Sequence, residues 1–369
     1  MSQTIRRVEE TDYAALTRLQ DAVWFPLRSE NSWHWLINQN PDQGDYPGGY
    51  VYQSPDTGEI LGFIGVTRLG FKRAGEDLFA NTGHTMIALP DATGAGFRLA
   101  ATMIRKTEGF AAFTLNNNAM AARVHSALRA KPIHETTSNQ SASWITNRMQ
   151  FYRAGIGRRI HSATKYKLAR LTGERMNKWR DLPEDFSTQP NVQRVKDPMK
   201  KDDAREEFAH RLAAEDFITV RRDHTRLSWR LSDPELKAPH LMWSFDRGNG
   251  VEGWLIAMIT KESEISAPAL TIVDLISLSA STNDVLPSLV RTAIDAARAM
   301  RMTRLNLPHF SPETERALNP LLESARIRTS HMHSYVKAID LSHDELEKSW
   351  RHTPWDGDYF FALRQPPIR

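Results

Sequence analysis

Cysteine is absent from this chain of 369 residues. Disulfides, thiolate metal sites and a covalent thioester intermediate on the protein are therefore excluded. Long apolar runs are missing too, because no stretch approaches the roughly 18 residues that a membrane span requires. The amino-terminal sequence MSQTIRRVEETDYAAL is charged and lacks the apolar core of a signal peptide. We therefore expect a cytoplasmic protein without a transmembrane segment.

The signatures of several common enzyme classes are also absent. The sequence contains no His-Glu-x-x-His zinc motif, no Gly-x-Ser-x-Gly elbow and no Walker loop. His331 and His333 form too isolated a pair to indicate zinc. We expect no bound metal.

The composition is that of a globular protein, with 40% hydrophobic and 25% charged residues. At about 150 residues per domain, the length predicts two domains. The net charge of +4 is mild, but its excess is concentrated in one stretch in which Glu174 is the single acid. We interpret this stretch as a solvated basic connection between domains, with a contact to phosphates or to an anionic membrane surface as the alternative. Its basic residues are Arg148, Arg153, Arg158, Arg159, Lys165, Lys167, Arg170, Arg175, Lys178 and Arg180.

We predict that residues 1–146 form one α/β domain with a mixed sheet. A strand at 5–8 precedes a helix that Asp12 would cap, and two β-rich runs follow, separated by the turn Pro55-Asp56-Thr57-Gly58. The strand HTMIAL ends at Pro90, and the loop DATGAG then leads into an amphipathic helix, a strand and a final helix.

The rest of the chain divides into a connection and a second copy of this pattern. Residues 147–215 read as a basic and polar linker or as inserted helices. Residues 216–369 repeat the order of the first half: HTRLSWRLSDPELKAP is similar to NSWHWLINQNPDQG, and VEGWLIAMITK is similar to EILGFIGVTRL. The second copy has SASTNDVLPS in place of the glycine loop, so it should not bind a diphosphate.

The loop from Asp91 to Gly96 is the motif that carries chemistry. Gly94 and Gly96 let the backbone approach an anion without a Cβ atom, and the helix that follows directs its amino terminus at the same point. Arg98 could contribute a positive charge. An ordinary connection between a strand and a helix is the alternative.

The order of elements and this loop resemble the GNAT superfamily of acyl-CoA-dependent N-acyltransferases, in which Arg/Gln-x-x-Gly-x-Gly/Ala binds the coenzyme A diphosphate. Gly94 and Gly96 match that pattern, whereas Asp91 replaces the usual Arg or Gln. Asn118, Ala121 and His125 match a second element of the family, with histidine at the position of the tyrosine that protonates the leaving thiolate. The resemblance implies two GNAT-like domains, each a mixed central sheet flanked by helices. It also implies acetyl-CoA or another acyl-CoA as the cofactor, bound by Gly94, Ala95, Gly96, Phe97, Arg98 and Asn118.

The same resemblance places the thioester carbonyl where the strand before the glycine loop and the next strand separate. His84 is then the candidate general base, acting directly or through a water, with a structural histidine as the alternative. Asn116 could orient the acceptor or the pantetheine arm, or could simply be a turn residue at the end of a strand. His125 is the candidate proton donor, with an exposed or packed helix histidine as the alternative. Trp33 and Trp35 could wall an acceptor pocket, with core packing as the alternative. The two carboxylates of the sequence WDGD, Asp356 and Asp358, could attract an ammonium group, although a plain turn would also explain them.

These observations predict direct acyl transfer, with acetylation as the expected case, to the amine of a small molecule such as an amino sugar or an amino acid derivative. The tryptophan segments and the tail WRHTPWDGDYFFAL are similar to two-domain members associated with surface-polysaccharide genes. One alternative resembles the Fem peptidoglycan ligases, which also have two GNAT-like domains but use aminoacyl-tRNA; nucleic acid is otherwise not expected as a partner. The other is a non-catalytic binding protein.

Overall fold

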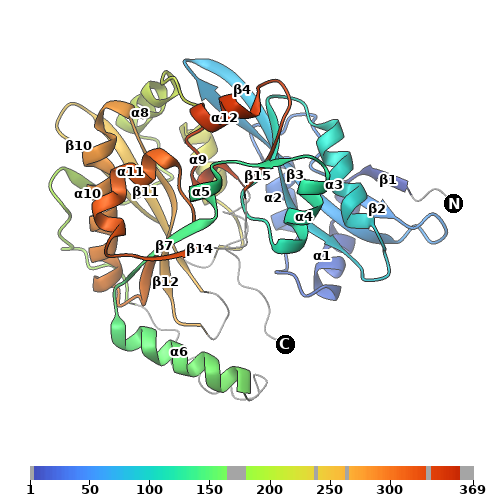
Figure 1. The fold of residues 1–369 in the computed structure, drawn as a ribbon, viewed down its shortest axis with the longest axis horizontal. Coiled ribbons are helices and arrows are strands. Elements are labelled where there is room, and N and C mark those ends of the chain that lie inside the picture. The colour runs from blue at the N-terminus through green and yellow to red at the C-terminus, as the bar shows by residue number, and fades with distance from the viewer. Residues whose placement is uncertain (1–3, 164–179, 237–239, 262–265, 330–333, 358–369) are drawn as a thin grey trace.

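The computed structural model describes residues 4–163, 180–236, 240–261, 266–329 and 334–357. Two sheets lie side by side, each with helices on its faces (Figure 1). In each sheet one pair of strands is parallel, β4 with β5 and β12 with β13, and the other pairings between the strands of each sheet are antiparallel. The predicted α/β class with mixed sheets is therefore confirmed.

The first sheet has the order β1-β2-β3-β4-β5-β15-β6, with β9 paired to β3. Its strands are β1 (Thr4–Arg7), β2 (Gly49–Gln53), β3 (Ile60–Arg73), β4 (Glu76–Ala88), β5 (Ala111–Thr114), β6 (Lys131–Pro132), β9 (Thr219–Val220) and β15 (Tyr335–Ala338). The associated helices are α1 (Tyr13–Ala22), α2 (Glu30–Asn38), α3 (Ala95–Lys106), α4 (Ala119–Ala127) and α5 (Glu135–Ser138).

The second sheet has the order β14-β7-β13-β12-β11-β10-β8. Its strands are β7 (Gln140–Ile145), β8 (Val192–Val195), β10 (His240–Asp246), β11 (Val251–Thr260), β12 (Ala269–Ser277), β13 (Arg304–Leu307) and β14 (Arg326–Thr329). The remaining helices are α6 (Arg148–Ala163), α8 (Asp203–Ala213), α9 (His224–Leu231), α10 (Thr282–Ala299), α11 (Pro312–Leu322) and α12 (His343–Ser349), with short 3₁₀ turns at Glu10–Asp12, Ser279–Ser281 and Pro354–Asp356.

The architecture is duplicated. The series β1-α1-α2-β2-β3-β4-α3-β5-α4 recurs as β8-α8-α9-β10-β11-β12-α10-β13-α11, with the two-residue strand β9 added between α8 and α9. The second series begins at β8, inside the range 147–215 that the sequence suggests as a linker, because β8 pairs with β10 as an edge strand.

The two halves also exchange strands. β7 lies before residue 146 but pairs with β13 and β14 of the second sheet. β15 lies near the carboxyl end but pairs with β5 and β6 of the first sheet. A boundary at residue 146 therefore does not separate the two sheets.

The halves share one apolar core at their junction. The indole rings of Trp35 on α2 and Trp229 on α9 stack with centroids 5.4 Å apart. Each indole donates a hydrogen bond from Nε1 to the backbone carbonyl of the other residue, at 2.8 and 3.1 Å. Because α2 and α9 occupy equivalent places in the two series, this contact is reciprocal and locks the halves together.

Candidate functional site

The turn between β4 and α3 has the backbone geometry of an anion site. Gly94 has φ +78° and forms the N-cap of α3, so a side chain there would be strained. Nothing lies within 4 Å of the places where Cβ atoms would stand on Gly94 and Gly96. The first hydrogen bond of the helix runs from the amide of Arg98 to the carbonyl of Gly94, at 3.1 Å. The amides of Gly96 and Phe97 precede it and remain available to a ligand.

The charges around this turn favour an anion. The first turn of α3 contains no acidic residue, and the helix dipole adds partial positive charge at its amino terminus. Arg98 is exposed, and its Nη1 donates to the hydroxyl of Tyr52 at 3.3 Å, which holds the guanidinium beside the turn. Phe97 is exposed as well, whereas Ala95 is buried against the sheet. Asp91, which is also exposed, is the one opposing charge in the loop.

The strands β4 and β5 separate before β4 reaches this turn. Their parallel pairing covers Ala80–Thr82 and Ala111–Phe113, after which β4 continues to Ala88 beside β3. The register of β4 on β3 also shifts between His84 and Ile87, which marks a bulge, and Thr85 in the bulge has φ +49°. Bulges of this kind re-aim side chains and occur next to active sites.

His84 lies at that bulge and is buried. A Cβ on Gly65, its partner on β3, would stand 2.0 Å from the His84 ring, so the ring occupies the space that glycine leaves. Nδ1 of His84 lies 3.1 Å from the hydroxyl oxygen of Thr85. Burial, together with the nearby charge of Arg28, lowers the pKa of His84 to about 3. The ring is therefore neutral at pH 7.

The residues expected beyond β5 have distinct places. Asn118 is the N-cap of α4, because its side-chain oxygen accepts hydrogen bonds from the amides of Met120 and Ala121 at 3.0 and 2.9 Å. His125 is buried in α4, burial lowers its pKa to about 4, and its ring is stacked at 6.3 Å from that of Tyr335. Asn116 is half-buried in the turn after β5.

The residues expected to bind the acceptor are mostly structural in this arrangement. Trp33 and Trp35 are fully buried in the shared core, so they present no open wall. Asp356 is fully buried and accepts hydrogen bonds from Arg222 at 3.0 Å and from the indole of Trp350 at 2.9 Å. Asp358 lies outside the described residues. Nothing in the sequence WDGD indicates that Asp356 is buried, and for that reason the two carboxylates suggested a binding surface.

The second half also has a bulge, and a buried cluster fills the space beside it. The register of β12 on β11 shifts between Ile272 and Asp274, so this bulge lies before Asp274, whereas the bulge in β4 lies after His84. Asp274 is fully buried and forms an ion pair with Arg222 at 2.9 Å. Thr353 donates to the same carboxylate at 2.8 Å, and Asp356 pairs with the same guanidinium. A buried salt-bridge cluster therefore lies beside the bulge of the second half.

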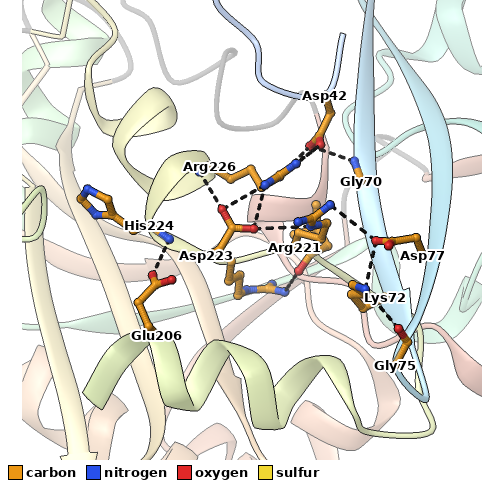
Figure 2. Close-up of polar contacts among 12 residues, drawn as sticks. Asp42, Gly70, Lys72, Gly75, Asp77, Glu206, Arg221, Asp223, His224 and Arg226 are labelled. Atoms are coloured by element: carbon orange, nitrogen blue, oxygen red, sulfur yellow. Dashed lines mark hydrogen bonds and ion pairs between the residues drawn. The ribbon is translucent and has the colours of Figure 1, made fainter. Parts of the chain in front are cut away.

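A cavity of about 280 Å³ lies between α8, β9 and the β3–β4 hairpin. Its lining includes Lys72, Glu206, Arg221 and Asp223 (Figure 2). Lys72 and Arg221 both pair with Asp77, at 3.0 and 3.4 Å, and Arg221 also pairs with Asp223 at 3.4 Å. At about 3.3 Å per residue, Lys72 is about 23 Å along β3 from Gly65, so this cavity is separate from the end of β4. Sequence reasoning missed it because its charges come from distant segments.

Solved structures with a similar fold include N-acyltransferases. No family model and no curated protein sequence matches this chain. A GCN5-related N-acetyltransferase from Anabaena variabilis is 11% identical with a TM-score of 0.55, covering 91% of this chain and 72% of its own. A probable N-acyltransferase of unknown function from Enterococcus faecalis is 10% identical with a TM-score of 0.56, covering 93% and 74%. Saccharomyces cerevisiae N-myristoyltransferase, solved with bound myristoyl-CoA and inhibitors, is 9% identical with a TM-score of 0.55, covering 96% and 86%. At these identities the likeness shows the fold, which is GNAT-like in both halves.

Proposed function

We propose that this chain is an acyl-CoA-dependent N-acyltransferase whose cofactor binds the first half. The observation that carries the proposal is the turn at Gly94, whose open glycines and amides at Gly96 and Phe97 match the needs of a diphosphate. The GNAT-like fold supports it. Acetyl-CoA is the first donor to test, and we propose as acceptor the amine of a small molecule such as an amino sugar or an amino acid derivative.

In this proposal some residues of the first half bind the cofactor, and others position or contact the reacting groups. The amides of the turn and the guanidinium of Arg98 would hold the diphosphate. When bound, the thioester supplies an activated acyl group for a direct attack by a neutral amine, since no cysteine exists to carry the acyl group. His84, neutral at pH 7, would accept a hydrogen bond from the amine and align its lone pair. Asn116 would orient the acceptor or the pantetheine arm. As the new C–N bond forms and the C–S bond breaks, the proton that the amine nitrogen loses would pass to the leaving sulfur, so that coenzyme A departs as the thiol. His125, whose pKa burial lowers to about 4, would be neutral and would only hydrogen-bond that sulfur through its N–H.

The second half would support the first. Its strand β12 leads into a 3₁₀ turn and α10 without a glycine, and the buried cluster around Arg222 fills the space beside its bulge. We therefore propose that it stabilises the pair, with β15 completing the catalytic sheet.

Thermal unfolding of the full chain with acetyl-CoA, with coenzyme A and without ligand tests the cofactor site. A ligand at a hundredfold excess over its Kd should stabilise the folded chain by about 2.7 kcal/mol. Gly94→Asp should abolish this shift, because the substitution puts a carboxylate where the diphosphate would lie. Gly75→Asp is the matched control: Gly75 has φ +84° and equally open surroundings, but it lies at the opposite end of β4.

The result decides whether the turn binds the cofactor and, together with an assay of acyl transfer, whether the chain is an enzyme or a binding protein. If the shift survives Gly94→Asp and Gly75→Asp alike, the turn does not bind the cofactor and the proposal fails. A second candidate, a non-catalytic acyl-CoA-binding protein, is favoured by the low pKa of His84, which makes this ring a weak base. A shift that depends on Gly94, without any acyl transfer to a panel of amines, would select that candidate.

A further inference from the structure

Helix α6 stands apart from the two packed halves. It follows β7 of the second sheet, and Figure 1 shows it extending below that sheet instead of covering either face. A helix of a globular protein normally turns its apolar stripe toward the core. The position of α6 therefore raises the question of what its side chains contact.

The apolar stripe of α6 faces solvent. Met149, Tyr152, Ile156 and Ile160 are 65%, 68%, 59% and 46% exposed. Their spacings of three, four and four residues place them on one face, while Ala154 on the opposite side is buried. Water is an unfavourable neighbour for a contiguous apolar stripe of this length, so such stripes mark a site of interaction.

Arginines border this stripe on both sides. A helix turns about 100° per residue, so Arg148 and Arg159 lie along one margin and Arg153 along the other. All three are exposed, and the sequence of α6 contains no acidic residue. The outward face thus combines an apolar centre with two basic margins.

The charge and the apolar surface together select one partner. A second copy of α6 packed on this stripe would bring arginine against arginine, and a nucleic acid would pair with the arginines but leave the apolar centre in water. An anionic lipid surface satisfies both, because apolar side chains enter the acyl boundary while arginines extend to the phosphates. At 16 residues and about 1.5 Å per residue, α6 is about 24 Å long and would lie in the plane of the surface. Among the described residues, no helix has the length and hydropathy to cross a bilayer.

We propose that α6 docks this protein onto anionic membrane surfaces, with Met149, Tyr152, Ile156 and Ile160 inserted at the level of the headgroups. This inference is independent of the proposed acyl transfer. It assigns a role to the described part of the basic stretch between residues 148 and 180.

Co-sedimentation of the full chain with lipid vesicles tests the proposal. The chain should pellet with vesicles of phosphatidylcholine and phosphatidylglycerol in equal parts, but not with phosphatidylcholine alone, and high salt should release it. Ile156→Asp should weaken partitioning about tenfold. The triple variant Arg148→Gln, Arg153→Gln, Arg159→Gln should weaken it about a hundredfold, since each arginine near a charged surface contributes about fivefold.

Met199→Asp provides the matched control, because Met199 is 46% exposed and lies outside α6. It should pellet like the unaltered chain. Equal partitioning to neutral and anionic vesicles, or none to either, overturns the proposal. Binding to RNA that Ile156→Asp leaves unchanged would identify a nucleic-acid surface instead. If Ile156→Asp lowers the thermal midpoint by several degrees, another segment of this chain covers the stripe and the proposal also fails.

Discussion

At the scale of single residues, Gly65 determines where the ring of His84 lies. The ring fills the space beside the glycine, and burial there accounts for the low pKa of the imidazole. His84 is a candidate through the family resemblance, which places the thioester carbonyl where the strand before the glycine loop and the next strand separate. The resemblance does not identify Gly65, although a glycine inside the apolar run GFIGV is a sign of close approach by another group.

Gly65→Ala should therefore lower turnover without weakening cofactor binding. The added Cβ would stand 2.0 Å from Cε1 of His84, so the ring must leave its place. We expect kcat to fall at least about tenfold, because misplacing a catalytic group by 1 Å is costly, while the thermal shift with acetyl-CoA persists. Steady-state kinetics and thermal unfolding measure the two effects.

A double-mutant cycle separates chemistry from packing. If the effect acts through His84, then Gly65→Ala adds nothing to the loss of turnover in His84→Ala, and the smaller side chain relieves the clash. Gly62→Ala, on the same strand and with no contact closer than 3.3 Å, is the control. Turnover of Gly65→Ala at the level of the unaltered chain would remove His84 from the mechanism.

At the scale of elements, the local sequence pattern predicted whether a segment is a helix or a strand, but not which sheet a strand joins. The amphipathic runs predicted α3 and α10, and turn chemistry predicted the hairpin of β2 and β3 around Pro55–Gly58. The sequence did not predict which sheet β7 and β15 join, because these strands are only six and four residues long. Short strands carry no signal for which sheet they join, so their exchange between halves depends on tertiary packing alone.

This exchange predicts that residues 1–146 do not fold alone. Without β15, the fully buried strand β5 becomes an open edge, and β7 has lost both of its neighbours. Circular dichroism and NMR of the fragment should show little cooperative structure, whereas adding residues 147–369 in trans should restore it. A fragment 1–146 with dispersed amide signals and a cooperative melt would contradict this prediction and support a domain boundary at 146.

At the scale of the whole molecule, reciprocal contacts join the halves into one unit. Arg226 on α9 forms an ion pair with Asp42, which follows α2, and Arg28, which precedes α2, lies 3.7 Å from Asp233, which follows α9. These ion pairs flank the stacked pair of Trp35 and Trp229. Because the contacts bury charge as well as apolar surface, removing one charged partner weakens the junction from both sides, and the halves should unfold together.

Several buried histidines make the stability of this unit depend on pH. Burial lowers the pKa of His84 and His309 to about 3, of His125 and His240 to about 4, and of His352 well below its usual value. These rings carry no proton in the folded chain at pH 5, but in the unfolded chain each gains one below about pH 6.5. The unfolded state binds more protons, so the free energy of unfolding falls as the pH drops below about 6.5 and is unaffected by these rings above it.

The expected slope approaches about 1.4 kcal/mol per pH unit for each buried histidine. Urea unfolding at several pH values between about 7 and 5 measures it. His309→Gln should lessen the slope by the share of one proton, whatever its effect on absolute stability. A free energy of unfolding that stays level or rises from pH 7 to pH 5 would mean that these rings take up protons in the folded chain, and so that water reaches them.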